Sequence, residues 1–271
     1  MTEIAVAVAQ FAPGTDTDAN IETIRELTDA AAARGAQLVV FPEYSSFFVN
    51  PVGASFLEAA EPLDGPFVEA LRELADDRGV VVVAGMAEQR PADPGRFTNT
   101  VVAVSPDAGV VASYRKQHLY DAFGARESEW VAPGELDEPQ TFVVGGVRVG
   151  LQTCYDLRFP EVTRRIVDAG AELVVVPSEW VHGNLKVHHW RTLITARAIE
   201  NTVYVAASDH IPPVGVGTSM IVDPMGVPLA ELENETDFVI APVSAEQVRE
   251  VRSVNPALDL RRYRVVPVND R

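Results

Sequence analysis

Gly35-Ala-Gln-Leu-Val-Val-Phe-Pro42 and Gly170-Ala-Glu-Leu-Val-Val-Val-Pro177 are identical at six of eight positions. Each is a short, continuous apolar run between turn-forming residues, which is typical of a buried strand. An eight-residue match also occurs between unrelated α/β strands, so it does not show a repeat by itself. The repeated order of the elements on both sides of it argues against chance.

The same order of elements surrounds both segments. In each half a strand and a helix precede the matching segment, and a helix, an apolar strand and a pair of strands around a turn follow it. The other strands are expected at 4–11, 80–86, 98–104 and 110–114, and again at 147–153, 202–208, 218–222 and 227–232. Continuous apolar strands that alternate with helices predict sheets covered by helices. Two such β-α-β-α-β-β halves predict an α/β fold with two sheets packed face to face, a four-layer α-β-β-α sandwich.

Helix start and stop signals support this order. Asp16 is a good N-cap for a helix that ends before Gly35, and the apolar residues within it have helical spacing. Two further helices have proline at the first position and glycine after the last. The four helices are expected over 16–34, 66–78, 160–168 and 186–201. Since no linker or low-complexity segment interrupts the pattern, residues 1–271 are expected to form one domain.

Composition excludes several classes of function. A chain of 271 residues with 47% hydrophobic residues can bury a large core without a metal or disulfide. A formal net charge of −17 with no basic cluster argues against a nucleic-acid or anionic-membrane partner. The first residues lead directly into a strand without a signal-peptide pattern, and no apolar run is long enough to span a bilayer. The single cysteine suits a reducing compartment, so a cytoplasmic protein is expected.

Cys154, the only cysteine, follows the apolar strand at 147–153 and precedes the helix that begins at Pro160. A thiol at such a turn lies close to helix-terminal N–H groups, which favour the thiolate and can bind an oxyanion. The ordinary alternative is a small buried hydrophobic residue. Position alone therefore leaves both readings open.

Two charged residues follow other predicted strands. Glu43 comes just after the strand that ends at Pro42, and Lys116 comes just after the strand that ends at Tyr114. Ligands of α/β folds bind beyond the carboxyl ends of the strands, where Cys154 is also expected. Singly, each is most often a solvated surface charge or a cap. Together they provide a nucleophile, a base and an electrostatic stabiliser.

These residues lie in motifs that resemble the nitrilase (carbon–nitrogen hydrolase) superfamily, from Ile4 to about Tyr263. The motifs are Phe41-Pro-Glu43, Tyr114-Arg-Lys-Gln-His-Leu-Tyr-Asp-Ala-Phe-Gly124, Arg126-Glu-Ser128, Cys154-Tyr-Asp-Leu-Arg-Phe-Pro-Glu161, Arg197-Ala-Ile-Glu-Asn201 and Gly217-Thr-Ser-Met-Ile-Val-Asp-Pro-Met-Gly226. The resemblance implies the α-β-β-α fold, a homodimer or higher homo-oligomer, and a catalytic triad of Glu43, Lys116 and Cys154. It also implies a second glutamate, which falls on Glu127, with Glu129 as the neighbouring alternative.

The chemistry implied by this resemblance is hydrolysis of a non-peptide C–N bond. Cys154 attacks an amide carbon and forms a thioester with release of ammonia, and Glu43 acts as the base. Lys116 and the backbone N–H of Tyr155 hold the oxyanion. No cofactor is needed, and the histidines lack a spacing with carboxylates that would make a metal site persuasive. His118 is expected to orient the lysine loop.

The substrate is less well defined. The cysteine motif is most similar to the ω-amidase and deaminated-glutathione amidase branch, whose members hydrolyse α-keto acid amides. Arg158 is expected either to form a bidentate interaction with a substrate carboxylate or to form a salt bridge with Glu161 or Asp156. Glu179 and Trp180 depart from the branch pattern and are expected near the substrate. Glu179 would disfavour an anionic substrate.

Three alternatives remain. An N-carbamoyl amino acid amidohydrolase would tend to have two adjacent arginines after the cysteine, and Leu157 occupies the first of these positions. An acyltransferase would use the same thioester with another acceptor. A catalytically silent scaffold would be expected to lack part of the triad. The resemblance also places the tail at 252–263 at a dimer interface.

Overall fold

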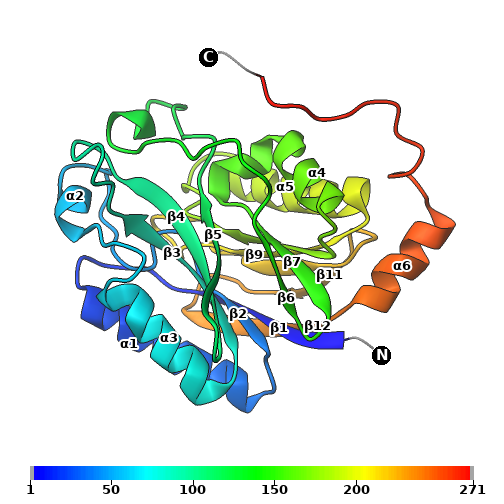
Figure 1. Cartoon of the computed structure of the whole chain (residues 1–271), viewed down its shortest axis with the longest axis horizontal. Helices are drawn as coiled ribbons and strands as arrows, with labels where there is room; N and C mark the ends of the chain where they lie inside the picture. Colours follow the sequence, from blue (N-terminus) through cyan, green and yellow to red (C-terminus); the bar gives the residue numbers. More distant parts are fainter. Residues whose placement is uncertain (1–2, 269–271) are drawn as a thin grey trace.

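The computed structural model describes residues 3–268, which form two six-stranded sheets and the helices beside them (Figure 1). The first sheet has the order β12-β1-β2-β3-β4-β5 and the second has the order β11-β10-β9-β8-β7-β6. The strands of the first sheet are β1 (Glu3–Gln10), β2 (Leu38–Val40), β3 (Val81–Glu88), β4 (Thr98–Ser105), β5 (Gly109–Arg115) and β12 (Asp237–Ser244). Those of the second are β6 (Thr141–Val144), β7 (Val147–Leu151), β8 (Leu173–Pro177), β9 (Tyr204–Ser208), β10 (Met220–Val222) and β11 (Pro228–Glu231).

The helices lie outside the two sheets. They are α1 (Thr17–Ala33), α2 (Ser55–Ala59), α3 (Pro66–Arg78), α4 (Pro160–Asp168), α5 (Lys186–Asn201) and α6 (Ala245–Val254), with 3-10 turns η1 (Glu127–Glu129) and η2 (Cys154–Arg158). Figure 1 shows α1 and α3 along one side of the molecule and α4 and α5 along the other. Within residues 3–268, no helix is long and apolar enough to cross a membrane.

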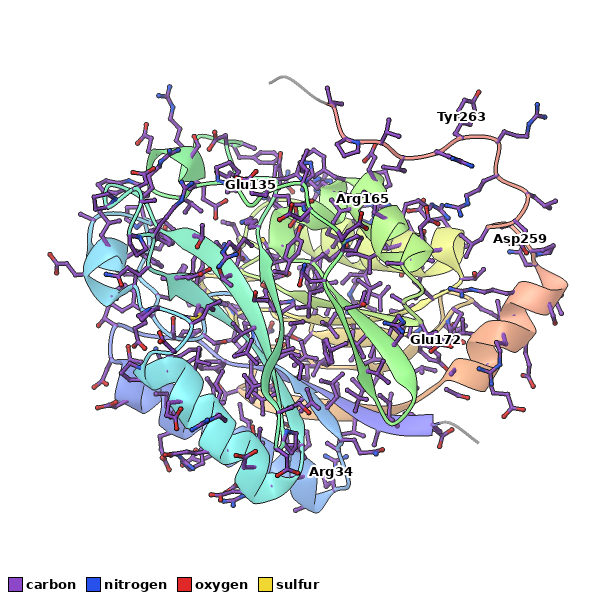
Figure 2. The ribbon with its side chains drawn as sticks, viewed as in Figure 1. Arg34, Glu135, Arg165, Glu172, Asp259 and Tyr263 are labelled. Atoms are coloured by element: carbon purple, nitrogen blue, oxygen red, sulfur yellow. The ribbon has the colours of Figure 1, made fainter. Side chains whose placement is uncertain are left out.

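Three apolar clusters hold the layers together, and side chains fill the space between the ribbons (Figure 2). One cluster lies between the sheets and contains residues of both, including Val83 and Leu151. A second packs the first sheet against α1 and α3, and a third packs the second sheet against α4 and α5. The predicted four-layer α-β-β-α sandwich is confirmed.

The matching segments of the sequence form β2 and β8, the second strand of each parallel set. Leu38 and Val40 belong to the cluster between the sheets, whereas Val39 and Phe41 belong to the cluster under the helices. Strands buried on both faces need apolar residues at every position. β1, β2 and β3 are parallel, as are β7, β8 and β9, so each set brings its carboxyl ends to one edge.

The capping residues act largely as predicted. The Asp16 side chain accepts a hydrogen bond from the N–H of Ala19 (3.2 Å) and begins α1. Gly79 ends α3 with φ 65°, a left-handed conformation that glycine adopts without strain. The glycine predicted after α4 is confirmed as well, because Gly170 directly follows the C-cap Ala169 and has φ 92°.

Two strands were not predicted. β6 pairs antiparallel with β7, and β12 pairs antiparallel with β1, so each adds one strand beside the first parallel strand of a half. Two predicted strand starts were also wrong. Thr202 and Thr218 have φ 46° and 50°, a left-handed conformation that does not belong to a strand, and β9 and β10 begin two residues later.

The tail at 252–263 packs partly on its own chain. Arg261 pairs with Asp168 (2.6 Å), and Leu258 packs against the cluster under α4 and α5. Tyr263, by contrast, is 90% exposed and points away from the body of the molecule (Figure 2). A role of this tail in a dimer stays a prediction.

Candidate active site

The predicted triad and Glu127 meet at one edge of the two sheets. Glu43 follows β2, Lys116 follows β5, Glu127 begins η1 and Cys154 begins η2. All four side chains are buried, with relative exposures between 1% and 7%. The structure therefore brings together four residues that are far apart in the sequence.

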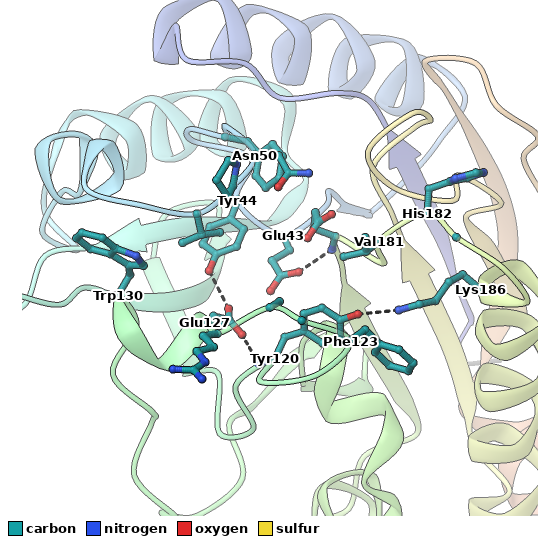
Figure 3. Close-up of a pocket in the computed structure, with 18 of the residues that line it drawn as sticks. Glu43, Tyr44, Asn50, Tyr120, Phe123, Glu127, Trp130, Val181, His182 and Lys186 are labelled. Carbon is teal, nitrogen blue, oxygen red and sulfur yellow. Dashed lines mark hydrogen bonds between the residues drawn. The ribbon is translucent and has the colours of Figure 1, made fainter.

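Glu43 accepts hydrogen bonds from three directions. Its Oε1 lies 3.0 Å from Lys116 Nζ and 2.5 Å from Asn99 Nδ2. Its Oε2 accepts a hydrogen bond of 2.6 Å from the backbone N–H of Glu179, shown as a dashed line in Figure 3. These three donors fix the orientation of the carboxylate.

Lys116 lies between two carboxylates. Its Nζ is 3.0 Å from Glu43 and 2.9 Å from Glu127. Burial lowers the pKa of the ammonium, but the neighbouring Glu127 and Glu43 raise it, and the net pKa is well above the usual value. Lys116 therefore carries a positive charge at neutral pH.

Glu127, rather than Glu129, is the second glutamate of this cluster. Its carboxylate accepts hydrogen bonds from the Tyr44 hydroxyl (2.9 Å) and from the N–H of Tyr120 (2.5 Å), both drawn in Figure 3. Glu129 is exposed and pairs with Arg126 instead.

Cys154 has a left-handed backbone, with φ 43°, which is strained for a residue with a Cβ. Its Sγ donates to the carbonyl oxygen of Glu179 (3.4 Å). Burial raises the pKa of the thiol well above its usual value, and Glu43 raises it further, whereas Lys116 lowers it. The expectation that N–H groups hold a thiolate was therefore wrong for the resting protein, since burial dominates and Cys154 is a thiol.

Gly85 of β3 lets the backbone of Glu43 and Tyr44 pass close beside this strand. A Cβ at Gly85 would lie 2.5 Å from the backbone nitrogen of Tyr44 and 2.6 Å from Cα of Glu43. Only glycine permits this approach of two backbones. The position of Glu43 therefore depends on a residue in a neighbouring strand.

Two buried residues after β9 hold the backbone around the site. The sequence analysis did not predict a role for either of them. His210 Nε2 lies 2.7 Å from the carbonyl oxygen of Glu43, and burial lowers the pKa of His210 to about 4. Asp209 accepts hydrogen bonds from the N–H groups of Trp180 (2.6 Å) and Val216 (2.8 Å). The only indication in the sequence was that both are polar residues directly after a predicted strand.

The buried imidazole predicts a pH dependence of stability. Because the pKa of His210 is about 4 when folded and 6.5 when unfolded, the unfolded state binds the proton first as the pH falls. The contribution of neutral His210 is present above pH 6.5 and is lost between pH 6.5 and 4. Relative to His210→Gln, the wild type is expected to lose about 2–3 kcal/mol of unfolding free energy between pH 7 and pH 4.5. Urea unfolding of both proteins measures this, and parallel losses would contradict it.

Asp156 joins the lysine loop to the cysteine turn. It accepts hydrogen bonds from the Tyr114 hydroxyl (2.7 Å) and from the N–H of His118 (3.0 Å), and its carboxylate also lies 2.7 Å from His118 Nδ1. The predicted structural role of His118 rests on these contacts. They connect the segments that carry Lys116 and Cys154.

A cavity of about 960 Å³ opens over the cluster (Figure 3). Glu43, Lys116 and Glu127 lie on its walls, together with Tyr44, Trp130 and His182. A smaller cavity adjoins Cys154 and is lined by Tyr120, Cys154, Tyr155, Arg158, Glu179, Trp180, Val181 and Lys186. All four predicted substrate-binding residues are among these.

Arg158 forms an ion pair with neither Glu161 nor Asp156 within the described residues. Its guanidinium lies 4.8 Å from the centre of the Trp180 ring, and its Nη2 lies 3.4 Å from His189 Nδ1. The structural alternative predicted for Arg158 was therefore wrong.

The carboxyl group of Glu179 is buried near Glu43 and Asp209. Burial raises the pKa of its carboxyl well above the usual value, and Glu43 raises it further. A raised pKa favours the neutral form of Glu179, which weakens the expected repulsion of an anionic substrate. Lys186 lines both cavities and was missed, because the first residue of a helix gives no sign of burial.

Comparison with known proteins agrees with the fold and with the family resemblance of the sequence. Residues 5–253 match the carbon–nitrogen hydrolase family. A deaminated glutathione amidase of Escherichia coli O157:H7 is 37% identical over 258 residues, which cover 95% of this chain and 97% of that protein. The omega-amidase NIT2 of Xenopus tropicalis is 29% identical over 282 residues, covering 100% and 99% of the two chains.

The solved structure of Saccharomyces cerevisiae Nit3, a member of branch 10 of the nitrilase superfamily, has the same architecture. It aligns with a TM-score of 0.85 at 26% identity and covers 97% of each chain. The predicted resemblance to the branch of ω-amidases and deaminated-glutathione amidases is confirmed by these relatives. Since the family match extends over most of the sequence, the chain belongs to the carbon–nitrogen hydrolase family, whose amidase members act on C–N bonds.

Proposed function

We propose that the protein hydrolyses the amide of a small, carboxylate-bearing molecule through a thioester on Cys154, with release of ammonia. The observation that carries this proposal is a buried ammonium held between two carboxylates beside a thiol. Lys116 lies 3.0 Å from Glu43 and 2.9 Å from Glu127, and Cys154 faces the adjoining cavity.

The first half of the reaction forms the thioester. The thiol proton passes to Glu43 as Sγ bonds to the amide carbon, because Cys154 is protonated at rest. The amide oxygen becomes an oxyanion, which the Lys116 ammonium and the N–H of Tyr155 stabilise. The C–N bond then breaks, and protonated Glu43 returns the proton to the departing ammonia.

The second half restores the enzyme. Glu43, again a carboxylate, removes a proton from water as the oxygen bonds to the thioester carbon. The same donors stabilise the second oxyanion, the C–S bond breaks, and the carboxylic acid product leaves. Glu127 holds Lys116 in place, because it accepts from the ammonium and from the N–H of Tyr120.

The substrate carboxylate binds Arg158. This guanidinium lines the cavity of Cys154 and has no carboxylate partner within residues 3–268. An α-keto acid amide fits this chemistry, and the similarity to a deaminated glutathione amidase supports it. The buried Leu157 occupies the position at which an N-carbamoyl amino acid amidohydrolase would tend to have a second arginine, which disfavours N-carbamoyl amino acids.

Ammonia release from a panel of amides tests this function. The panel contains α-ketoglutaramate, deaminated glutathione, N-carbamoyl amino acids, simple aliphatic amides and nitriles, with Cys154→Ala as the control. For deaminated glutathione, whose leaving group is a peptide, release of that amine is measured instead. Turnover of the α-keto acid amides that Cys154→Ala abolishes is the expected result. Preferred turnover of N-carbamoyl substrates would replace the substrate assignment, and acyl transfer to hydroxylamine without hydrolysis would favour a transferase.

The remaining features of the proposal concern the whole chain. Residues 1–271 act as one catalytic domain, the protein is a cytoplasmic homodimer, and its partner in the reaction is a small molecule. The exposed apolar residues Ile199 of α5 and Leu229 of β11 support self-association, and the unpaired Cys154 suits a reducing compartment. Light scattering after size exclusion measures the mass of the assembly.

A further inference from the structure

Two cations without carboxylate partners lie beside Cys154. Lys186 and Arg158 line the same small cavity, and neither forms an ion pair within the described residues. The Lys186 residue is only 8% exposed. Buried charges in proteins are normally paired, so the buried Lys186 needs an explanation, and the partly buried Arg158 beside it adds a second positive charge.

The position of Lys186 in its helix is also unfavourable. Lys186 is the first residue of α5, where the helix dipole is positive. Leu185, the N-cap, has φ 59° and provides no side-chain cap, and the first turn contains no acidic residue. Burial and the neighbouring Arg158 both lower the pKa of Lys186. An anion bound here would offset the burial, the dipole and the repulsion together.

Aromatic side chains hold the ammonium in place. Lys186 Nζ donates to the Tyr120 hydroxyl (2.8 Å) and lies 4.3 Å from the centre of the Phe123 ring (Figure 3). This leaves further N–H groups of the ammonium for a ligand. On the arginine, Nε is buried without a partner in the described part of the chain. Both cations therefore have unused donors at the cavity.

We infer that Lys186 and Arg158 together bind the substrate carboxylate, and that Lys186 makes the enzyme select anionic amides. This inference rests on the proposed function and adds Lys186 as the residue that determines specificity. The carboxylate lies between the two cations, at the end of the acyl chain opposite the amide that Cys154 attacks. The recognised class is an amide whose acyl part ends in a carboxylate.

The test uses a pair of substrates that differ mainly in charge. Glutaramate has a terminal carboxylate, and glutaramide has a neutral carboxamide in its place. The preference of the enzyme, measured as the ratio of kcat/KM for the two, is expected to fall about 10- to 100-fold in Lys186→Met. Most of the loss should appear in KM for glutaramate. Lys186→Arg should retain most of the preference, since it keeps the charge.

Arg191→Met is the matched control, because it removes a cation from the same helix that pairs with Glu231 away from the cavity. It should leave the preference of the wild type unchanged. A parallel loss on both substrates in Lys186→Met would show that Lys186 only holds Tyr120 in place, and would overturn the inference. An unchanged preference would overturn it as well.

Binding of glutarate to Cys154→Ala gives a readout that does not depend on turnover. Calorimetry should detect glutarate on this variant, with affinity at least about 10-fold weaker when Lys186→Met is added. Absence of glutarate binding, or equal binding in both proteins, would contradict the anion site. Hydrolysis of glutaramide at the rate of glutaramate by the wild type would refute the specificity while leaving the amidase function intact.

Discussion

Replacing Lys116 by methionine is expected to lower the free energy of unfolding by about 3–5 kcal/mol and to reduce kcat at least about 100-fold. The variant leaves the buried carboxylates of Glu43 and Glu127 together without their cation, and removal of one partner from a buried ion pair costs this much. It also removes an oxyanion donor, which is typically worth about 2.7–4 kcal/mol in the transition state.

Urea unfolding and ammonia release measure the two effects separately. Arg72→Met is the control for stability, because Arg72 forms an exposed pair with Glu69 on α3. That variant should lose no more than about 0.5 kcal/mol. A loss in Lys116→Met as small as that of the control would show that Lys116 does not neutralise a pair of buried carboxylates.

Glu43→Gln is expected to reduce kcat by about 10²- to 10⁴-fold, the usual contribution of a general base. The effect should be large because burial and Glu43 raise the pKa of the Cys154 thiol, so attack needs a group that accepts its proton. Glutamine has the shape of the carboxylate but cannot take up that proton. Its amide nitrogen must also face Lys116, Asn99 or the N–H of Glu179, which are all donors.

Steady-state ammonia release measures the loss, and circular dichroism with urea unfolding shows whether the variant is folded. Glu161→Gln is the matched control, because this exposed glutamate of α4 lies only seven residues from Cys154 in the sequence. It should retain wild-type turnover. A folded Glu43→Gln variant with more than about one tenth of wild-type kcat would exclude Glu43 as the base.

The predicted layers could be found in the sequence because their signals are local. Proline at Pro66 and Pro160, the cap at Asp16 and the continuous apolar runs mark elements without reference to the rest of the chain. β6 and β12 also contain apolar residues, but they lie outside the repeated β-α-β-α-β-β order from which the strands were predicted. β12 joins the sheet by pairing with β1 at the other end of the sequence, and this register depends on the assembled fold.

The residues of the site likewise divide into those that the sequence could predict and those that depend on the assembled fold. Glu43, Lys116 and Cys154 follow strands, and the ends of parallel strands meet at one edge, so their proximity could be predicted. The family resemblance favoured Glu127 and kept Glu129 as the alternative, and only loop geometry separates the buried glutamate from its exposed neighbour.

The protonation of buried side chains could not be predicted from the sequence, because it depends on how deeply each group is buried. The raised pKa values of the Cys154 thiol and of the Glu179 carboxyl both depend on desolvation in the assembled site. Lys186 was missed for a related reason, because lysine at a helix start is ordinarily solvated.

Detection of an acyl group on Cys154 tests the proposed mechanism most directly. Wild-type protein is mixed with α-ketoglutaramate, quenched in acid within milliseconds to seconds, digested and examined by mass spectrometry. The expected result is a peptide containing Cys154 with the mass of the acyl group added. Hydroxylamine should release that group as a hydroxamate, and Cys154→Ala should show neither adduct nor ammonia. Sustained ammonia release by Cys154→Ala would contradict the thioester mechanism.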